Sequence, residues 1–270
     1  MKTFLTIAAS DCIGGAGIQA DILTASHFGL YAASALTAVT AQNSCGVEAC
    51  HPVGPDMLER QLHCIMADFR PDAVKVGMMP DTDTVEIVSR FLRRFSLDNV
   101  VIDPVLRPSF GNEFTCTGVD VAIVEKLLPV ATLITPNIDE FKTIAQIAGG
   151  WPTCRAMLLK GGHTDHDDDN TELAVDRLYA PSFPGSHPIE FKAVRIETSN
   201  THGSGCVLSS AIASCLALGK DIPQAVRDGK EFLHRALSHG KEIRFGKCGY
   251  GPSLLRCHIQ DKKTHTAQTR

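Results

Sequence analysis

Short apolar runs alternate with helical patterns along most of the chain. Each run is flanked by polar or turn residues, which is typical of a parallel strand buried on both faces. The expected strands span residues 3–8, 73–76, 99–102, 132–134 and 156–159. Between the runs, apolar side chains recur at helical spacing. The expected helices span residues 18–28, 57–68, 83–95, 119–128 and 138–147.

This alternation favours βαβ units with right-handed crossovers. The fold class expected is therefore α/β, a doubly wound and mostly parallel sheet with helices on both faces. Residues 173–179 and 189–196 differ, because they predict a small antiparallel strand pair joined by the turn at 181–185 at one sheet edge. Two more helices are expected, over residues 205–218 and 222–239.

No linker rich in proline, glycine or serine divides the chain. We therefore expect a single domain over residues 1–258 and a flexible polar tail over residues 259–270. The chain has 270 residues, of which 44% are hydrophobic, so it can bury a core without a disulfide or a metal.

Charge and hydropathy argue against two classes of partner. The chain has 26 Lys plus Arg against 30 Asp plus Glu, a net charge of −4, and no basic run, which argues against nucleic-acid binding. The apolar stretch at the N-terminus is too short for a secretory signal, and no apolar span elsewhere approaches about 18 residues, so we expect no membrane association. The ten cysteines are scattered without a CxxC pair, which predicts reduced thiols in a cytoplasmic chain rather than a zinc site.

A glycine-rich turn follows the first expected strand. In an open parallel sheet, ligands bind at the carboxyl ends of the strands. Residues 10–21, SDCIGGAGIQAD, contain three glycines in four positions and lead into a helix. Such a turn lets a ligand approach the backbone, and the helix N-terminus offers unpaired amides. The same residues also fit a plain strand-to-helix turn, and their spacing matches neither the dinucleotide fingerprint nor the P-loop.

A second turn, NTHGSGC at residues 200–206, precedes the apolar helix at 205–218. A Gly-Ser-Gly turn at a helix start presents several amides in one direction, and the helix dipole adds about half a positive charge. This arrangement favours an oxyanion or a phosphoryl group in transit. Cys206 would lie in the first helical turn, where we expect its pKa to fall below the reference of about 8.5; the alternative is a buried cysteine in a core helix.

Oxygen donors and one lysine follow the middle strands. Asp103 lies in VIDP, Asn137 and Glu140 lie in TPNIDE, and Lys160 lies in LLKGGH. These residue types form the usual set for Mg²⁺ and nucleotide phosphates, although Asn137 alone could simply cap a helix. The acidic stretch at 164–170 lacks the glycine and the closing glutamate of a calcium loop, so we expect a solvated loop there.

Taken in order, these motifs resemble the bacterial hydroxymethylpyrimidine and phosphomethylpyrimidine kinases of thiamin biosynthesis, which belong to the ribokinase-like superfamily. The resemblance covers residues 3–240 and is carried by LTIAASDCIGGAGIQADILTASHFGLYAASALTAVTAQNSCGV, VKVGMM, VVIDPVL, TPNIDEF, LLKGGH and NTHGSGCVLSSAIA. It implies phosphorylation of 4-amino-5-hydroxymethyl-2-methylpyrimidine, and then of its monophosphate, with ATP and Mg²⁺. Family members are commonly homodimers.

The resemblance also implies roles for single residues. The pyrimidine would lie over the glycine turn, and Gln42 would bond its ring. The other matched pocket positions are Ala16, Asp21, Met78 and Val105. Lys160 would bind phosphate, with Asn137 and His202 on the nucleotide side, and Asp103 and Glu140 at the Mg²⁺ end. The matched anion hole and catalytic positions are Gly203, Ser204, Gly205 and Cys206.

Cys206 occupies the position where sugar kinases of the superfamily carry the aspartate that accepts the hydroxyl proton. A loose phosphoryl-transfer transition state asks little of a base, so we expect the amides and Lys160 to supply most of the rate enhancement.

The chain departs from the family pattern at Ala9, where a glycine is usual, at Cys12-Ile13, where Pro-Ser is common, and in two further places. Residues 107–111 replace a loop that usually carries Ala-Lys-Ser-Gly, and about eight residues separate Ile147 from Ala156 where relatives have a further helical stretch. Two alternatives remain open, namely a pyridoxal or pyridoxine kinase of the same cysteine-bearing branch and a non-catalytic pyrimidine-binding relative. Gln42 and Met78 favour the pyrimidine, and the intact Lys160 favours turnover.

Overall fold

The computed structural model describes residues 1–106, 116–161, 172–180, 187–249 and 251–253. The strands are β1 (Thr3–Asp11), β2 (Tyr31–Asn43), β3 (Gly46–Pro52), β4 (Ala73–Val76), β5 (Val100–Ile102), β6 (Leu133–Ile134), β7 (Met157–Leu159), β8 (Leu173–Tyr179) and β9 (Ile189–Val194). The helices are α1 (Gly17–His27), α2 (Pro55–Asp68), α3 (Thr82–Arg94), α4 (Val119–Ala122), α5 (Ile138–Ala148), α6 (Ser204–Ala217) and α7 (Ile222–Gly240).

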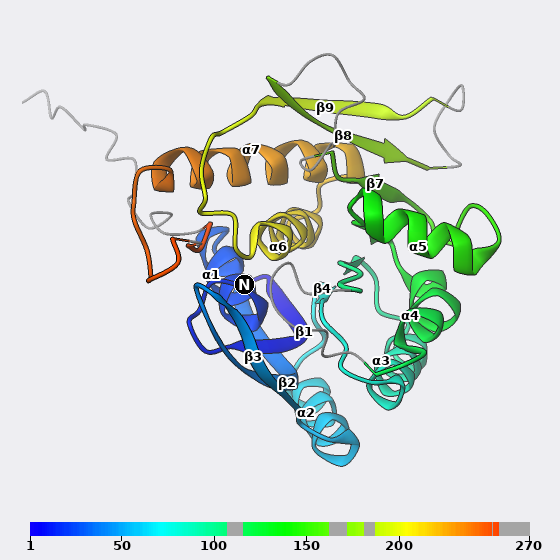
Figure 1. Cartoon of the computed structure of the whole chain (residues 1–270). Coiled ribbons are helices and arrows are strands. Elements are labelled where there is room, and N and C mark those ends of the chain that lie inside the picture. The colour runs from blue at the N-terminus through cyan, green and yellow to red at the C-terminus, as the bar shows by residue number, and fades with distance from the viewer. Residues whose placement is uncertain (107–115, 162–171, 181–186, 250, 254–270) are drawn as a thin grey trace, which may run out of the picture.

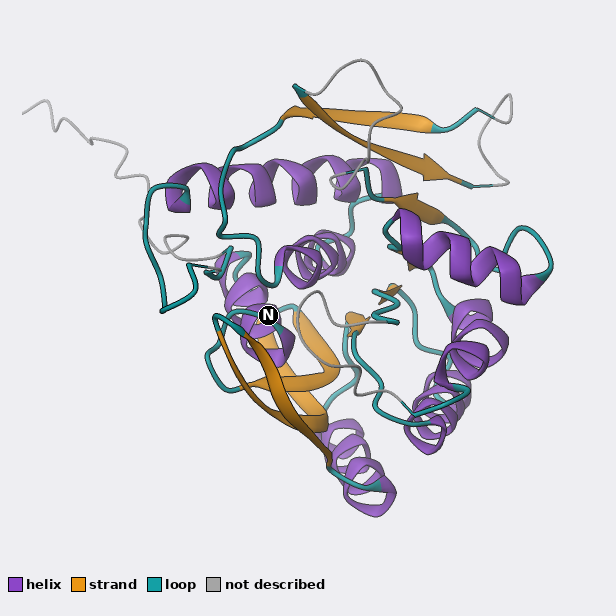
Figure 2. Ribbon diagram, viewed as in Figure 1, coloured by secondary structure: helices purple, strands orange, loops and turns teal. Residues whose placement is uncertain are grey.

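Within the described residues the strands form one nine-stranded sheet in the order β3-β2-β1-β4-β5-β6-β7-β8-β9. All neighbours from β2 to β7 pair in parallel. Strand β3 pairs antiparallel with β2 at one edge, and β8 and β9 form the antiparallel pair at the other edge. The predicted fold class is confirmed, including the small antiparallel edge at β8 and β9 (Figure 2).

The hairpin of β2 and β3 was not expected from the sequence. Strand β2 reads YAASALTAVTAQN, which is rich in alanine, a residue that intrinsically disfavours strands. It is held by long pairing with β1 on one side and β3 on the other. The helix expected over residues 119–128 also differs, because α4 continues as a π-helical turn (Ile123–Leu127) and a 3₁₀ turn (Leu128–Val130) around Pro129.

Helices cover both faces of the sheet. Helices α6 and α7 stack on one face with α1 beside them, and α2, α3, α4 and α5 cover the other face (Figure 1). Successive side chains of β1 alternate between the two cores, so Phe4 packs toward α6 while Leu5 and Ile7 pack toward α2 and α3. Burial of each such side chain contributes about 1.5–3 kcal/mol, which explains why most positions of β1 are apolar.

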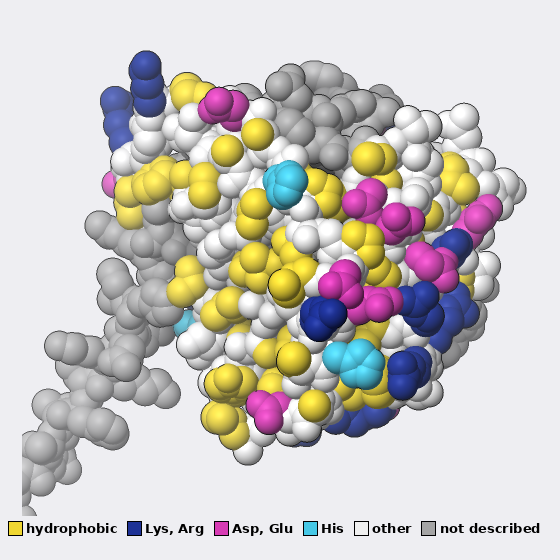
Figure 3. Space-filling view, turned by 90° about the horizontal axis from the view of Figure 1, so that it is seen from below, with side chains coloured by type: hydrophobic (Ala, Val, Ile, Leu, Met, Phe, Trp, Pro, Cys, Tyr) yellow, Lys and Arg dark blue, Asp and Glu magenta, His cyan; other side chains and the backbone are white. Residues whose placement is uncertain are grey.

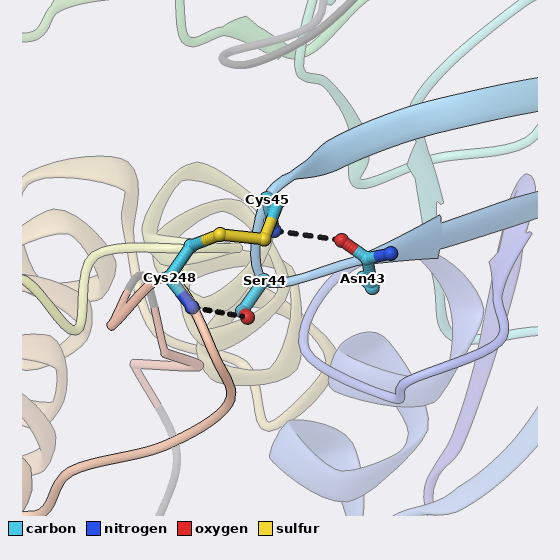
Figure 4. The surroundings of a disulfide bond; sticks show 4 residues. All are labelled: Asn43, Ser44, Cys45 and Cys248. Atoms are coloured by element: carbon cyan, nitrogen blue, oxygen red, sulfur yellow. Dashed lines mark hydrogen bonds between the residues drawn. A yellow bond between two sulfur atoms is a disulfide. The ribbon is translucent and has the colours of Figure 1, made fainter.

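A disulfide corrects the expectation that every cysteine is a reduced thiol. Cys45, in the turn between β2 and β3, is bonded to Cys248 in the segment after α7, and their Cα atoms are 5.2 Å apart (Figure 4). The backbone N–H of Cys248 also donates to Ser44 Oγ at 3.2 Å. These residues lie 203 positions apart, so no local spacing could indicate the pair.

The surface carries charges of both signs. On the face seen from below, acidic and basic side chains lie intermixed (Figure 3). The ion pairs Arg60–Asp56 on α2 and Arg90–Glu59 between α3 and α2 are partly exposed examples of such opposite charges. No helix in the described part of the chain is long and apolar enough to cross a membrane.

Four predicted features lie outside the described residues. They are the loop at 107–111, the acidic stretch at 164–170, the turn at 181–185 and the tail at 259–270. The link from α5 to β7, over residues 149–156, contains no helix, as its short length predicts.

Candidate active site

A cavity of about 970 Å³ opens at the carboxyl ends of the parallel strands. It brings together almost every predicted site residue, from turns far apart in the sequence. The predicted residues that line it are Ala16, Gln42, Met78, Asp103, Val105, Asn137, Glu140, Lys160, His202, Gly203, Ser204, Gly205 and Cys206. Their individual roles stay predictions, but their convergence on one cavity is a property of the structure.

Asp11 organises the glycine turn between β1 and α1. Its carboxylate is buried and accepts hydrogen bonds from the backbone N–H groups of Ile13, Gly15 and Ala16 at 3.0, 2.9 and 2.8 Å. Burial raises the pKa of this carboxyl, but the hydrogen bonds from His202 and from the turn outweigh it, so the pKa lies below its usual value. The turn is therefore built around an ionised carboxylate.

The start of α6 packs directly on this turn. Gly203 adopts φ +74, and a Cβ there would lie 1.9 Å from the carbonyl oxygen of Gly15. A Cβ on Gly15 would in turn lie 2.4 Å from the His202 ring. Both positions must therefore be glycine for the two turns to touch.

Cys206 lies in the first turn of α6, as expected, but its chemistry differs from the prediction. Burial raises the pKa of the thiol, and the nearby carboxylates of Asp21 and Asp103 add to this effect. The ammonium of Lys75 acts in the opposite direction without outweighing them. The predicted fall in pKa is wrong, because desolvation at this site exceeds the effect of the helix N-terminus.

Lys160 and Asp103 form the charged centre of the cavity. Lys160 Nζ lies 2.9 Å from Asp103 Oδ1 and 3.9 Å from Glu140 Oε2. Asp103 also accepts a hydrogen bond from Thr135 Oγ1 at 3.1 Å. Burial disfavours charge on both groups, yet their mutual attraction raises the pKa of Lys160 and lowers that of Asp103, so the pair is ionised. A Cβ on Gly205 would lie 3.2 Å from Asp103 Oδ2, which is a tight contact, so α6 begins close against this pair.

Asn137 and Glu140 form a capping box at the start of α5. Asn137 N–H donates to Glu140 Oε2 at 2.7 Å, and Glu140 N–H donates to Asn137 Oδ1 at 2.8 Å. The helix-cap interpretation of Asn137 is thus correct, and both residues still line the cavity. Burial, aided by the charge of Asp103, raises the pKa of Glu140 to about 7.

The carboxylates of Asp103 and Glu140 fit a partly protein-bound Mg²⁺. Magnesium in kinases is usually held by one or two carboxylates, with waters and substrate phosphates as the other ligands. Among the described residues no cluster of three or more His, Cys, Asp or Glu forms a closed metal site. Burial is the main cause of the raised pKa of Glu140, and the charge of Asp103 adds to it, so a cation bound between the two carboxylates would favour the ionised form of Glu140.

Asp21 does not line the cavity, contrary to its expected contact with the pyrimidine. Its carboxylate is fully buried and accepts hydrogen bonds from Lys75 Nζ at 2.8 and 2.9 Å, Thr6 Oγ1 at 2.6 Å and Ser210 Oγ at 2.7 Å. It therefore supports Lys75, which does line the cavity and which the sequence prediction missed. A lysine inside the buried run AVKV was the available signal, since lysine is almost never buried without a partner.

The sequence prediction also missed the opposite end of the cavity. There the end of β9 and the chain after it, residues 194–198, line the cavity together with Leu233, His234 and Leu237 of α7. His234 Nε2 lies 3.2 Å from the carbonyl oxygen of Val194. These residues follow no recognisable motif, because they come from the ordinary polar and apolar positions of a strand end and a helix face.

Comparisons with known proteins show the family of this chain. The phosphomethylpyrimidine kinase family model matches residues 11–253. The chain is 38% identical to a hydroxymethylpyrimidine/phosphomethylpyrimidine kinase of Rhizobium meliloti, covering 92% of this chain and 94% of that protein. It is 36% identical to the chloroplastic thiamine biosynthetic bifunctional enzyme of Arabidopsis thaliana, covering 92% of this chain but 49% of that protein, so it spans about half of that enzyme's length.

Among solved structures, an ADP complex of Bacillus subtilis pyridoxal kinase superposes with a TM-score of 0.78 and 32% identity. The match covers 95% of this chain and 99% of that one. A family match over most of the chain, together with a cavity that gathers the family's motifs, leads to one conclusion. This chain belongs to the phosphomethylpyrimidine kinase family.

Proposed function

We propose that this chain transfers the γ-phosphoryl group of ATP to the hydroxymethyl group of 4-amino-5-hydroxymethyl-2-methylpyrimidine, and then a second phosphoryl group to the monophosphate. One observation carries this proposal. A single cavity holds Lys160, two carboxylates and the amides at the start of α6 directly beside the glycine turn after β1. This is the combination that phosphoryl transfer to a small alcohol requires.

Charge stabilisation in this mechanism comes from Lys160 and from the backbone of residues 203–206. Because the transition state is loose, catalysis depends mainly on position and on charge along the transferred group. Gly203, Ser204, Gly205 and Cys206 line the cavity at the start of α6, where the helix dipole favours an anion. Mg²⁺, held by Asp103 and Glu140, would neutralise charge on the nucleotide phosphates.

Cys206 is not needed as a strong base in this mechanism. Its raised pKa keeps it a thiol at neutral pH. A hydroxyl can attack through a loose transition state and lose its proton late, so a weak acceptor beside it is sufficient. We infer that Cys206 packs against the substrate hydroxymethyl group, while the amides and Lys160 supply the main rate enhancement.

Coupled ADP release tests the proposal. Purified protein with Mg-ATP is given hydroxymethylpyrimidine, its monophosphate or pyridoxal in parallel assays. Turnover on both pyrimidines with little on pyridoxal is the expected result. No ADP release with any of the three would overturn the proposal and would favour the non-catalytic pyrimidine-binding relative.

Pyridoxal phosphorylation is the second candidate function. The structural match to Bacillus subtilis pyridoxal kinase over 95% of this chain supports it. Pyridoxal also presents a ring with a hydroxymethyl group, so the same cavity could accept it. A higher kcat/KM for pyridoxal than for hydroxymethylpyrimidine in the same assay would favour this candidate.

Lys160 offers a direct test of the charge-stabilising role. Lys160→Ala would leave the buried Asp103 carboxylate without both the charge and the hydrogen bond of Lys160, so Lys160→Gln, which removes the charge but keeps an N–H donor, is the better variant. We expect kcat to fall by about 10²–10³, the effect of losing one stabilising donor. Lys192→Gln, at an exposed position of β9, is the matched control. Wild-type turnover in Lys160→Gln would refute the role.

The resemblance also supports a homodimer in the cytoplasm. Light scattering after size exclusion measures the mass directly, and a monomer at micromolar concentration would contradict the dimer. In a reducing cytoplasm, Cys45 and Cys248 would be a dithiol rather than a disulfide. Trapping the thiols with an alkylating agent during lysis reports which form the cell maintains.

A further inference from the structure

The His202 ring connects the two glycine turns of the cavity. Its Nε2 lies 2.8 Å from Asp11 Oδ2, the same oxygen that accepts the N–H groups of Gly15 and Ala16. Since the ionised Asp11 carboxylate can only accept, His202 Nε2 is the donor. One hydrogen bond therefore joins the turn after β1 to the residue that precedes the first turn of α6.

The backbone of His202 is anchored independently of its ring. Its N–H donates to the carbonyl oxygen of Gly251 at 3.1 Å, and its carbonyl oxygen accepts from Ser253 N–H at 3.0 Å. Removing the ring would thus leave the chain path at 200–203 in place. What the ring adds is contact with Gly15 and the hydrogen bond to Asp11.

We infer that His202 is a positioning residue, which acts through Asp11 to hold the turn at 12–16 at a set distance from the amides at the start of α6. The inference rests on the proposed function, in which the first turn carries the pyrimidine and the second stabilises the transferred phosphoryl group. The hydrogen bond between His202 and Asp11 then aligns the substrate hydroxyl with the phosphoryl group, although neither residue contacts these two groups. This differs from the expected role of His202 in binding the nucleotide.

The inference predicts a fall in kcat without a matching change in KM for ATP when the His202 ring is removed. Misplacement of reacting groups by about 1 Å can lower a rate by about a hundredfold without loss of binding. We therefore expect His202→Ala to lower kcat by about 10- to 100-fold while KM for ATP changes by less than about twofold. His202→Gln, whose amide can donate to Asp11, should recover most of the rate. His63→Ala, at an exposed position of α2, is the matched control and should match wild type.

Amide hydrogen exchange gives a readout that does not depend on activity. In His202→Ala the N–H groups of Ile13, Gly15 and Ala16 should exchange faster by roughly tenfold, and His202→Gln should restore their protection. Thermal unfolding of all three proteins shows whether the fold is retained. If wild type turns over none of the substrates, the proposed function fails. The exchange data alone still show whether the His202 ring holds the turn at 12–16 in place.

Several results would overturn the inference. Unchanged kcat or unchanged exchange in His202→Ala would mean that the contact does not set the geometry. A rise in KM for ATP with kcat preserved would return His202 to nucleotide binding. A glutamine variant as slow as the alanine variant, with both unfolding at lower temperature, would indicate a structural role only.

Discussion

At the residue scale, the Cys206 thiol shows how the folded environment can reverse a local tendency. A cysteine in the first turn of a helix is favoured as a thiolate by the helix dipole. Here burial dominates and two nearby carboxylates reinforce it, so the pKa rises above its usual value although Lys75 lies near. The reactive thiolate form is therefore disfavoured at neutral pH at this position.

The pH dependence of alkylation tests this state of Cys206. Because only the thiolate reacts, we expect iodoacetamide to label Cys206 slowly at pH 7, with a rate that still rises above pH 9. Peptide mapping by mass spectrometry separates this label from that of Cys64, which is exposed on α2 and serves as the reference. Labelling of Cys206 that is faster than that of Cys64 at pH 7 would contradict the raised pKa.

Gln42 lines the cavity at the end of β2 and is the proposed hydrogen-bond partner of the pyrimidine ring. Gln42→Leu would leave the ring edge unpaired, and we expect binding of hydroxymethylpyrimidine to weaken by about 1–3 kcal/mol. Isothermal titration calorimetry measures this change in binding free energy. Gln61→Leu is not a suitable control, because the Gln61 side chain forms hydrogen bonds with the backbone of Leu36. Gln224→Leu, on the exposed side of α7, is suitable. Unchanged affinity would place the ring elsewhere.

At the element scale, the first turn of α5 serves both the helix and the cavity. The capping box satisfies two backbone N–H groups that would otherwise lack partners. The same hydrogen bonds fix the Glu140 carboxylate beside Lys160 and Asp103, where burial raises its pKa to about 7. The helix end thus contains a carboxyl group whose ionised form is disfavoured by burial.

The raised pKa of Glu140 predicts that the free energy of unfolding depends on pH. The folded pKa of Glu140 lies above its unfolded value of about 4.3, so the folded state binds more protons between these pH values. Stability from this group is therefore greatest below about pH 4.3 and is lost as pH rises through about 7. Glu140→Gln keeps the capping box and removes the charge. Urea titrations should show its advantage over wild type growing from pH 5 to pH 8.

Glu231→Gln, at an exposed position of α7, is the control for that series, since Glu231 does not line the cavity. Its difference from wild type should stay small and nearly constant across the same pH range. An advantage of Glu140→Gln that does not depend on pH would mean that the carboxyl is not titrating in this window.

At the scale of the whole molecule, the chain after α7 returns to the cavity and ties its parts together. This segment turns back toward α1 (Figure 1). Asn200 Nδ2 donates to the carbonyl oxygens of Gly240 and Ile243 at 2.8 and 2.7 Å. Cys248 then reaches the hairpin turn at Cys45, close to cavity residues Asn43 and Gly46. The segment thus links the hairpin, the loop before α6 and the end of α7.

Reduction should weaken this link. A disulfide that closes so long a loop contributes about 2–4 kcal/mol, chiefly by restricting the unfolded chain. We expect dithiothreitol to lower the thermal midpoint of wild type and to leave Cys45→Ser/Cys248→Ser unaffected. Cys64→Ser, which keeps the disulfide, should respond as wild type does. A midpoint that dithiothreitol leaves unchanged in wild type would show that the bond is absent or contributes no stability.

The parallel strands and most helices were predictable because their signals are local. A buried run such as residues 73–76 or a periodic helix such as residues 83–95 carries its burial pattern in consecutive residues. Strand β2 was not predictable, because its alanines acquire strand geometry only through pairing with β1 and β3. The motif residues of the cavity were also recognisable, because glycine-rich turns and polar residues at strand ends are short patterns of consecutive residues.

The linear pattern alone was sufficient for the fold class and for the group of residues that meet at the strand ends, because a parallel sheet necessarily gathers those ends at one edge. Only the tertiary structure could show that Asp21 forms a buried ion pair with Lys75, that burial raises the pKa of the Cys206 thiol, and that Cys45 is bonded to Cys248. Each of these depends on burial or on contact between residues far apart in the chain. Desolvation and long-range contacts are properties of the packed molecule, and no short stretch of sequence contains them.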